Sequence, residues 1–447
     1  MANQTFVMRA ARWLVFGAFA ALLVAGPFER AFKDAERYAY LTDIMPSEWG
    51  ATNLWLQSTD CALARGAWLA LCEGDKLVPI SERAIADDPG HALLLDVWAM
   101  ASGRRATLPD VVRLNTLVDT AGLLALAALF FAMRAHLTSI ALMWLGPVEY
   151  LGWMSTSPHW SYIGLVSLSG VLPIALAGRS LGLLAPRAGA GWIALGLLFV
   201  ALATLMRESV GLMGFAVSLV VAIALALRRK PMRPLAITAV LAALAVSSPK
   251  WVVAARDLAF DMQPAERIAA HGLAHTLYLG LGFVDNKWGI QYDDDYGKAV
   301  AHEVDPSIVF CSPEYFRLMG RLYLRRWLED PVEIPRIYVE KAWMLLSRPT
   351  LYPGPPFGVV LSLGLIHLIA ASALGAWRRL GFVQGLVIEG VAVTFLLLYL
   401  AQAMAALPSH TYAMPANAYV LVLAGVIAEF FARAALRLLD REPLARS

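Results

Sequence analysis

Residues 191–230 read GWIALGLLFVALATLMRESVGLMGFAVSLVVAIALALRRK, and this stretch decides the fold class. It holds two long apolar runs, which are separated by Arg207-Glu208 and closed by Arg228-Arg229-Lys230. A helix of about 20 apolar residues spans the hydrocarbon core of a bilayer. The two runs therefore predict a pair of consecutive membrane spans joined by a short charged turn.

Similar apolar runs recur along the chain. Of its 447 residues, 59% are hydrophobic, and the mean hydropathy is +0.60. This composition is too apolar for a soluble domain and fits an all-α polytopic membrane protein. We expect about ten transmembrane helices in a single membrane domain over residues 1–447. The expected spans are residues 13–27, 114–133, 137–154, 162–177, 191–206, 211–227, 235–248, 357–377, 382–407 and 416–432.

Charge distribution gives the expected topology. Arginine and lysine gather in the termini and in short connections such as those at Arg134, Arg179 and Arg228. The two long connections, residues 28–113 and 250–356, are balanced or slightly acidic. Positive charge marks cytoplasmic segments, so an even number of spans places both termini in the cytoplasm and both long loops in the periplasm or outside the cell. The excess of arginine over lysine and the abundance of alanine are typical of a GC-rich bacterium, so we expect a multi-pass protein of the bacterial cytoplasmic (inner) membrane.

All three cysteines, Cys61, Cys72 and Cys311, lie in the long loops. An oxidising compartment would permit a disulfide between Cys61 and Cys72. A single helix over residues 62–71 would instead hold the two positions about 16 Å apart, too far for a bond. The sequence leaves both arrangements open.

Carboxylates in the first long loop are candidates for catalysis. Asp34 and Glu36 follow the first span directly, and Asp87-Asp88 precede a helix-like apolar run at residues 92–101. Paired carboxylates just outside a bilayer can bind a divalent metal or act as a general base. Asp88 before Pro89 is also a good helix N-cap, which gives this pair a structural alternative.

Two helices with clear start signals are predicted in the second long loop, after Ser312-Pro313 and after Asp330-Pro331. One face of the first helix is apolar and aromatic and consists of Phe316, Met319, Tyr323 and Trp327. A second face is a basic stripe of Arg317, Arg321 and Arg325. Such a helix is expected to lie in the membrane interface, with aromatics in the acyl boundary and arginines at phosphate level. It either touches ordinary headgroups or forms a platform for a phosphate-bearing lipid substrate.

Charged and polar residues gather at one predicted depth, near the extracytoplasmic ends of the spans. Ionisable groups within spans are costly and usually functional. Those at this depth are Asp119, Glu149, His159, Arg207, Glu208 and His410. As a set they predict a binding site beneath the long loops, although each alone is also explained by snorkelling to the interface. Glu389 and Glu429 lie nearer the cytoplasmic side and are candidates for a proton path.

Four short phrases carry a resemblance to a known superfamily. Residues 110–115 (DVVRLN) enter the second span, and residues 206–212 (MRESVGL) form an arginine turn between two spans. Residues 312–346 form a helix pair before a late span, and residues 410–415 (HTYAMP) precede the last one. With its acidic first loop, the chain looks like a GT-C-fold, protein-mannosyltransferase-like membrane glycosyltransferase. That superfamily uses polyprenyl-phosphate sugars as donors.

The resemblance implies an inverting sugar transfer at the extracytoplasmic face. A first-loop carboxylate would deprotonate the acceptor hydroxyl, alone or with a divalent cation (Mg or Mn) held by Asp87 and Asp88. Arg207 or the basic stripe would stabilise the lipid phosphate that leaves. The remaining substrate-binding candidates are Glu208, Asp119, Glu149, His159, His410 and Tyr412. Membrane lipid and a lipid-linked sugar are the expected partners, and nucleic acid is not.

Two alternative functions stay open. A polymerase or ligase of lipid-linked polysaccharides also has many spans and a large late loop, but the large first loop argues against it. A proton-coupled transporter would use acids at different depths, such as Glu389 and Glu429, although the two halves show no internal repeat.

Overall fold

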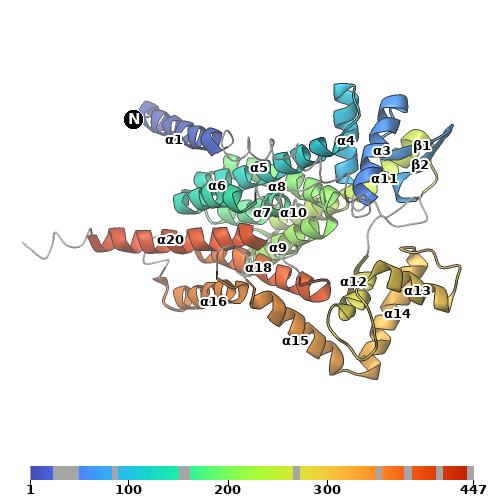
Figure 1. The fold of residues 1–447 in the computed structure, drawn as a ribbon. Helices are drawn as coiled ribbons and strands as arrows, with labels where there is room; N and C mark the ends of the chain where they lie inside the picture. The colour runs from blue at the N-terminus through green and yellow to red at the C-terminus, as the bar shows by residue number, and fades with distance from the viewer. Residues whose placement is uncertain are drawn as a thin grey trace, which may run out of the picture.

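The computed structural model describes residues 2–23, 50–82, 89–150, 162–264, 272–348, 355–376, 385–408 and 416–439 (Figure 1). Within these ranges the chain is helical apart from one two-stranded hairpin. The α-helices are α1 (Ala2–Leu23), α3 (Gly50–Arg65), α4 (Gly90–Ser102), α5 (Leu108–Ala132), α6 (His136–Tyr150), α7 (Tyr162–Ser180), α8 (Pro186–Met206), α9 (Glu208–Leu227), α10 (Met232–Val246), α11 (Ser248–Phe260), α12 (Gly272–Gly280), α13 (Asp294–Val304), α14 (Pro313–Glu329), α15 (Glu333–Leu346), α16 (Phe357–Ala373), α18 (Gly385–Ala405) and α20 (Asn417–Leu439). The strands are β1 (Ala70–Glu73) and β2 (Lys76–Pro79), and short 3-10 helices occur at Ile80–Glu82 and Leu281–Phe283.

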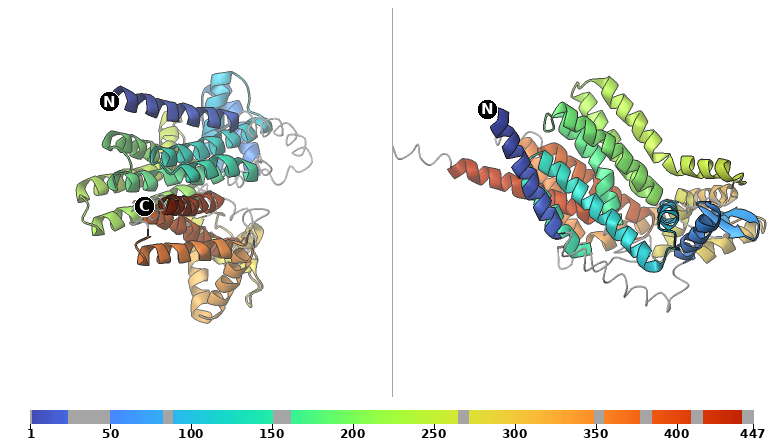
Figure 2. Two further views of the ribbon diagram at one scale, coloured as in Figure 1. Left: turned by 90° about the vertical axis from the view of Figure 1, so that its left-hand side faces the viewer. Right: turned by 90° about the horizontal axis from the view of Figure 1, so that it is seen from above.

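Every predicted span overlaps a helix within the described residues, but fewer helices meet the requirements for crossing a bilayer. By length and apolarity, five described helices can do so: α5, α8, α9 and most of α18 and α20. A sixth span follows if α10 and α11, which meet at 50°, form one bent span (Figure 2). The apolar parts of α1, α7 and α16 are shorter. The described residues thus support a multi-pass membrane protein with five to six candidate spans, against the ten expected.

The long apolar helices pack side by side as a bundle (Figures 1 and 2). Its core is formed by fully buried side chains such as Phe130, Leu172 and Phe395. Glycines permit the closest helix crossings: a Cβ on Gly122 of α5 would lie 2.1 Å from the carbonyl oxygen of Gly164 on α7. Small residues at helix contacts are how membrane helices gain packing contacts without help from the hydrophobic effect.

The described parts of both long loops lie at one end of this bundle, which we call the loop end (Figure 1). The start of α1 and the C-terminal end of α20 point to the opposite end. The loops also contact each other, because Arg256 of α11 donates from Nη1 to the Leu69 carbonyl at 3.1 Å. Beside this bond, the rings of Trp68 and Phe260 lie 5.8 Å apart. The two loops therefore form a joint cover over part of the loop end.

The first loop contains a disulfide-bonded unit. Cys61 and Cys72 are bonded, with their Cα atoms 5.3 Å apart. The alternative of one helix through residues 62–71 is wrong, because α3 ends at Arg65 and the chain turns at Gly66 (φ 68°) and Leu69 (φ 55°). β1 and β2 then pair antiparallel, with Cys72 opposite Leu77. A hairpin at this place was not expected from the sequence.

The disulfide can be tested by counting alkylated cysteines. Iodoacetamide on the chain unfolded without reductant should modify Cys311 alone, and after reduction it should modify all three cysteines by intact mass. Replacing Cys61 and Cys72 by serine should destabilise the first loop by about 3 kcal/mol, since a short loop is no longer closed in the unfolded chain. Modification of three cysteines before reduction would contradict the bond.

Candidate functional site

The charged pair Arg207-Glu208 breaks an otherwise apolar helical hairpin at the loop end. α8 ends at Met206, Arg207 adopts extended backbone (φ −158°, ψ 106°), and α9 starts at Glu208. The Arg207 carbonyl accepts from the N–H of Val210 at 3.1 Å, which starts the first turn of α9. Arg207 is half-buried and Glu208 is exposed. The break therefore places both charges at the end of the bundle, as the sequence predicted.

The start of α4 lies directly against this break. A Cβ on Gly90 would lie 2.6 Å from the backbone carbon of Leu205 and 2.7 Å from the backbone nitrogen of Met206. Only glycine allows the two backbones to come this close. The contact brings the first turn of α4, from the first long loop, next to Arg207.

His91 follows Gly90 and connects α4 to α5. It is fully buried, its ring stacks on Trp55 at 4.6 Å, and its Nε2 lies 3.1 Å from Oδ1 of Asn115. A carbonyl oxygen only accepts hydrogen bonds, so Nε2 is the donor in this pair. Sequence reasoning missed both residues as site candidates, since they are separated by 24 positions and no local pattern joins them.

Asp119 lies one helical turn beyond Asn115 on α5 and is only 1% exposed. Its Oδ1 accepts from the backbone N–H of Gly164 at 2.7 Å, so the carboxyl caps the first turn of α7. Its Oδ2 is buried and has no hydrogen-bond partner within the described ranges. Asp119 therefore has a structural role in joining α5 to α7, and one of its oxygens is left for a further contact.

The backbone of Glu149 lies at a similar depth. α5 and α6 form a hairpin, and Asp119 and Glu149 each lie about 20 Å along their helices from the connecting turn. Asp119 and the backbone of Glu149 thus both lie away from the turn of the α5–α6 hairpin.

The other loop and turn candidates lie outside the described residues. They are Asp34, Glu36, Asp87, Asp88, His159, His410 and Tyr412. Within the described ranges, no three His, Cys, Asp or Glu side chains group closely enough to hold a metal ion. The divalent cation considered for Asp87 and Asp88 stays a prediction.

Asp96 is a buried carboxyl that the sequence did not single out. Its Oδ2 accepts from Ser58 Oγ and from the Leu69 N–H, both at 2.8 Å. Burial raises the pKa of this carboxyl to about 7. Because Leu69 also bonds to Arg256, Asp96 connects α3 and α4 to the contact between the two loops.

In the second loop, α14 begins as predicted, since Ser312 Oγ accepts from the Tyr315 N–H at 3.2 Å. Its aromatic face packs against the protein, in a cluster with Tyr278 and Leu279, where Met319 is fully buried and Phe316, Tyr323 and Trp327 are half-buried. The prediction that this face enters the acyl boundary is therefore wrong for Met319, and the three aromatic side chains lie at least partly on protein. The same one-sided spacing serves a protein core as well as a lipid surface.

The basic stripe on α14 is exposed and partly neutralised. Arg317 pairs with Glu314 at 2.5 Å, and Arg325 pairs with Glu329 at 2.8 Å. Arg321 pairs with no carboxylate in the part of the chain that the structure describes. Exposed ion pairs of this kind are weak, so an incoming phosphate could still compete for the arginines.

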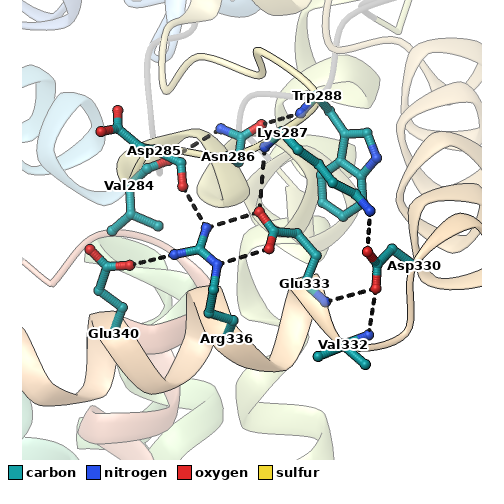
Figure 3. Close-up of polar contacts among 10 residues, drawn as sticks. All are labelled: Val284, Asp285, Asn286, Lys287, Trp288, Asp330, Val332, Glu333, Arg336 and Glu340. Atoms are coloured by element: carbon teal, nitrogen blue, oxygen red, sulfur yellow. Dashed lines mark hydrogen bonds and ion pairs between the residues drawn. The ribbon is translucent and has the colours of Figure 1, made fainter.

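A polar network fixes the corner between α14 and α15 (Figure 3). Asp330 Oδ1 accepts two backbone N–H groups at the start of α15, at 2.9 and 3.1 Å, which confirms the predicted helix start. Lys287 pairs with the same carboxyl and holds its pKa below the usual range. Arg336 forms an ion pair with Glu333 and donates a hydrogen bond to the Asp285 carbonyl at 2.6 Å. The segment before α13 is thereby bound to the helix pair.

Lys341 anchors the second loop to the bundle. Its side chain is fully buried, and Nζ donates to the Gly280 carbonyl at 3.0 Å and to the Ala406 carbonyl at 2.7 Å. These carbonyls lie at the C-terminal ends of α12 and α18. Burial lowers the pKa of Lys341 to about 7. A neutral amine has two N–H groups, which match the two carbonyls.

Comparison with protein-family models, with curated proteins and with solved structures finds no match for this chain. The resemblance to the GT-C glycosyltransferases therefore rests on the sequence phrases and the arrangement described above.

Lys341 should make stability depend on pH. Its folded pKa lies below the ordinary value of 10.5, so the unfolded chain binds more protons than the folded chain above about pH 7. The free energy of unfolding should rise from about pH 7 to pH 9, by at most about 1.4 kcal/mol per pH unit. Thermal unfolding in detergent measures this slope for the wild type and for Lys341→Met, which should lose it.

Lys298→Met is the matched control, because Lys298 belongs to the same loop but is exposed and paired with Asp295. It should keep the wild-type slope. Parallel pH profiles for the wild type and Lys341→Met would show that Lys341 does not titrate in this range.

Proposed function

We propose that this protein is a GT-C-type membrane glycosyltransferase, which moves a sugar from a polyprenyl-phosphate donor to an acceptor at the loop end. The convergence at the α8–α9 break carries the proposal. There the charged pair Arg207-Glu208, the first turn of α4 and the buried polar groups of α5 meet beneath two contacting loops. Such a set of polar groups at the end of an apolar bundle suits a substrate with an anionic head and a long apolar tail.

The complete fold under this proposal has ten spans, with α1, α6, α7 and α16 crossing as shorter helices. Both termini then lie in the cytoplasm, and the loop end faces the periplasm of a bacterial inner membrane. The concentration of arginine in the termini and the short connections supports this orientation.

The transfer is a single displacement. A carboxylate takes the proton of the acceptor hydroxyl, and the acceptor oxygen forms a bond to the anomeric carbon. The bond from that carbon to the lipid phosphate breaks, and the phosphate leaves with the bonding electrons. Inversion at the anomeric carbon follows from attack opposite the leaving group. Under this proposal Arg207 stabilises the growing phosphate charge, because guanidinium binds phosphate oxygens in a bidentate way.

We assign the base to Asp87 or Asp88 in preference to Asp34 or Glu36. Asp88 directly precedes Pro89, and the next residue, Gly90, lies against Leu205 and Met206 beside Arg207. The same two carboxylates would hold a divalent cation, if the reaction uses one. The remaining candidates, Glu149, His159, His410, Tyr412 and the basic stripe, would contact the sugar, the acceptor or the lipid headgroup.

The proposal is tested by glycan analysis in a host strain that depends on this protein. Arg207→Gln should lower formation of the glycosylated product by roughly 100-fold, since a charged group that stabilises the leaving phosphate is lost. Asp87→Asn or Asp88→Asn should lower it at least as much. Arg187→Gln, an exposed arginine at the opposite end of the bundle, is the matched control. Full activity in all four carboxylate variants (Asp34→Asn, Glu36→Gln, Asp87→Asn and Asp88→Asn) would exclude the first-loop base.

One observation favours a proton-coupled transporter as the second candidate. His367 Nε2 lies 2.8 Å from Glu389 Oε1 inside the bundle, and Glu389 is fully buried. An ionisable pair within the spans can exchange protons. Glu429 does not extend this path, because it pairs with Arg433 and accepts from the Leu137 N–H at the start of α6.

Proteoliposomes separate the two candidates. A transporter should show proton-coupled uptake that Glu389→Gln abolishes, whereas a glycosyltransferase should keep its product yield in that variant. The transporter would be favoured if Glu389→Gln lost proton-coupled uptake and Arg207→Gln still formed the glycosylated product in full.

A further inference from the structure

A groove lies between α9 and α18, at the end of the bundle opposite the loops. Its volume is about 220 Å³, and it is partly open to the surroundings of the bundle. On α9 it extends from Val217 to Arg228, the residue after the last turn, and on α18 from Val387 to Thr394. Since α9 ends and α18 begins at this end of the bundle, Arg228 stands at the mouth of the groove and Val217 at its inner part.

The walls of the groove are apolar. Apart from Arg228, its lining offers one polar side chain, and that hydroxyl, on Thr394, already donates to the Gly390 carbonyl at 2.7 Å. Gly390 leaves part of the groove open, because a Cβ there would meet no atom within 4 Å. Valine and leucine side chains supply most of the remaining lining. Hydrocarbon is the occupant that such a surface favours.

The mouth of the groove is positively charged. Arg228 pairs with no carboxylate in the described ranges. Arg229 and Lys230 follow it in the turn before α10, and Arg233 lies in the first turn of that helix. Basic residues next to a membrane helix attract anionic lipid headgroups. A planar guanidinium also binds two phosphate oxygens at once.

We propose that this groove binds an anionic phospholipid of the surrounding leaflet, with one acyl chain between α9 and α18 and its phosphate at Arg228. The groove is smaller than a pocket that encloses a drug-sized ligand, which measures roughly 300–1,000 Å³, so it admits part of one acyl chain and not two chains. The site lies at the opposite end from the α8–α9 break, so it is separate from the proposed transfer site and does not depend on that function.

The test is native mass spectrometry of the full-length protein in detergent, with dioleoyl phosphatidylglycerol or dioleoyl phosphatidylcholine added at equal concentration. The wild type should retain one phosphatidylglycerol in preference to phosphatidylcholine. Arg228→Gln should weaken phosphatidylglycerol binding by about fivefold and remove the preference, because the phosphate loses its charged partner. Gly390→Leu should reduce the binding of both lipids, because the side chain fills the place of the acyl chain.

Two matched controls accompany these variants. Arg187→Gln removes an exposed arginine at the same end of the bundle, and Gly191→Leu fills another helical glycine whose Cβ would meet no atom within 4 Å. Neither residue lines the groove, so both variants should bind lipid like the wild type. Ala224→Leu fills the groove from the α9 wall and should repeat the Gly390→Leu result, including where Gly390→Leu fails to fold.

The proposal would be overturned if Arg228→Gln retained phosphatidylglycerol at the wild-type level and a folded Gly390→Leu or Ala224→Leu variant did so too. Equal retention of the two lipids by the wild type would overturn it as well, since the phosphate at Arg228 would then contribute nothing.

Discussion

A helix that ends within or beside a bilayer leaves backbone N–H and carbonyl groups without partners, and in hydrocarbon each unmet group costs several kcal/mol. This protein satisfies several such ends with ionisable side chains from neighbouring helices. Asp119 of α5 accepts from the first turn of α7, and Glu429 of α20 accepts from the first turn of α6. Lys341 of α15 donates to the last carbonyls of α12 and α18. The packing of the bundle and the docking of the loops depend on these contacts.

The need to satisfy the backbone groups at helix ends divides the buried ionisable side chains into two kinds. A charge that caps a helix is held in place by backbone, as Glu429 is, and its burial needs no functional explanation. Asp119 is an intermediate case, because one oxygen caps α7 and the other is buried without a partner in the described residues. Arg207 stands at the break between α8 and α9, and its side chain does not cap the start of α9. Its place beside the first turn of α4 is what gives it a part in the functional argument.

Much of the helical framework could be predicted from the sequence, because a long apolar run can cross a bilayer only as a helix or as part of a closed barrel. The starts of α14 and α15 were also predictable, since Ser312 and Asp330 act through bonds to residues two or three positions away. The partners of Lys341 and His91 could not be predicted, because they come from distant segments. The aromatic face of α14 shows a second limit: its spacing indicates that one side is covered, but not whether lipid or protein covers it. The disulfide depends on the turn at Gly66 and Leu69. This turn could not be predicted, because a continuous helix through the same residues was an equally plausible interpretation of the sequence.

The contact of Lys341 with Ala406 has a consequence for how the protein is made. The two residues are 65 positions apart, and the lysine leaves the ribosome first. Until α18 enters the membrane, the amine lacks one of its two carbonyl acceptors, so the loss of its hydrogen bonds to water on burial is not yet compensated. The bond that attaches α15 to the end of α18 can therefore form only after α18 has been inserted. Docking of the second loop through Lys341 thus depends on the insertion of a segment that follows it in the chain.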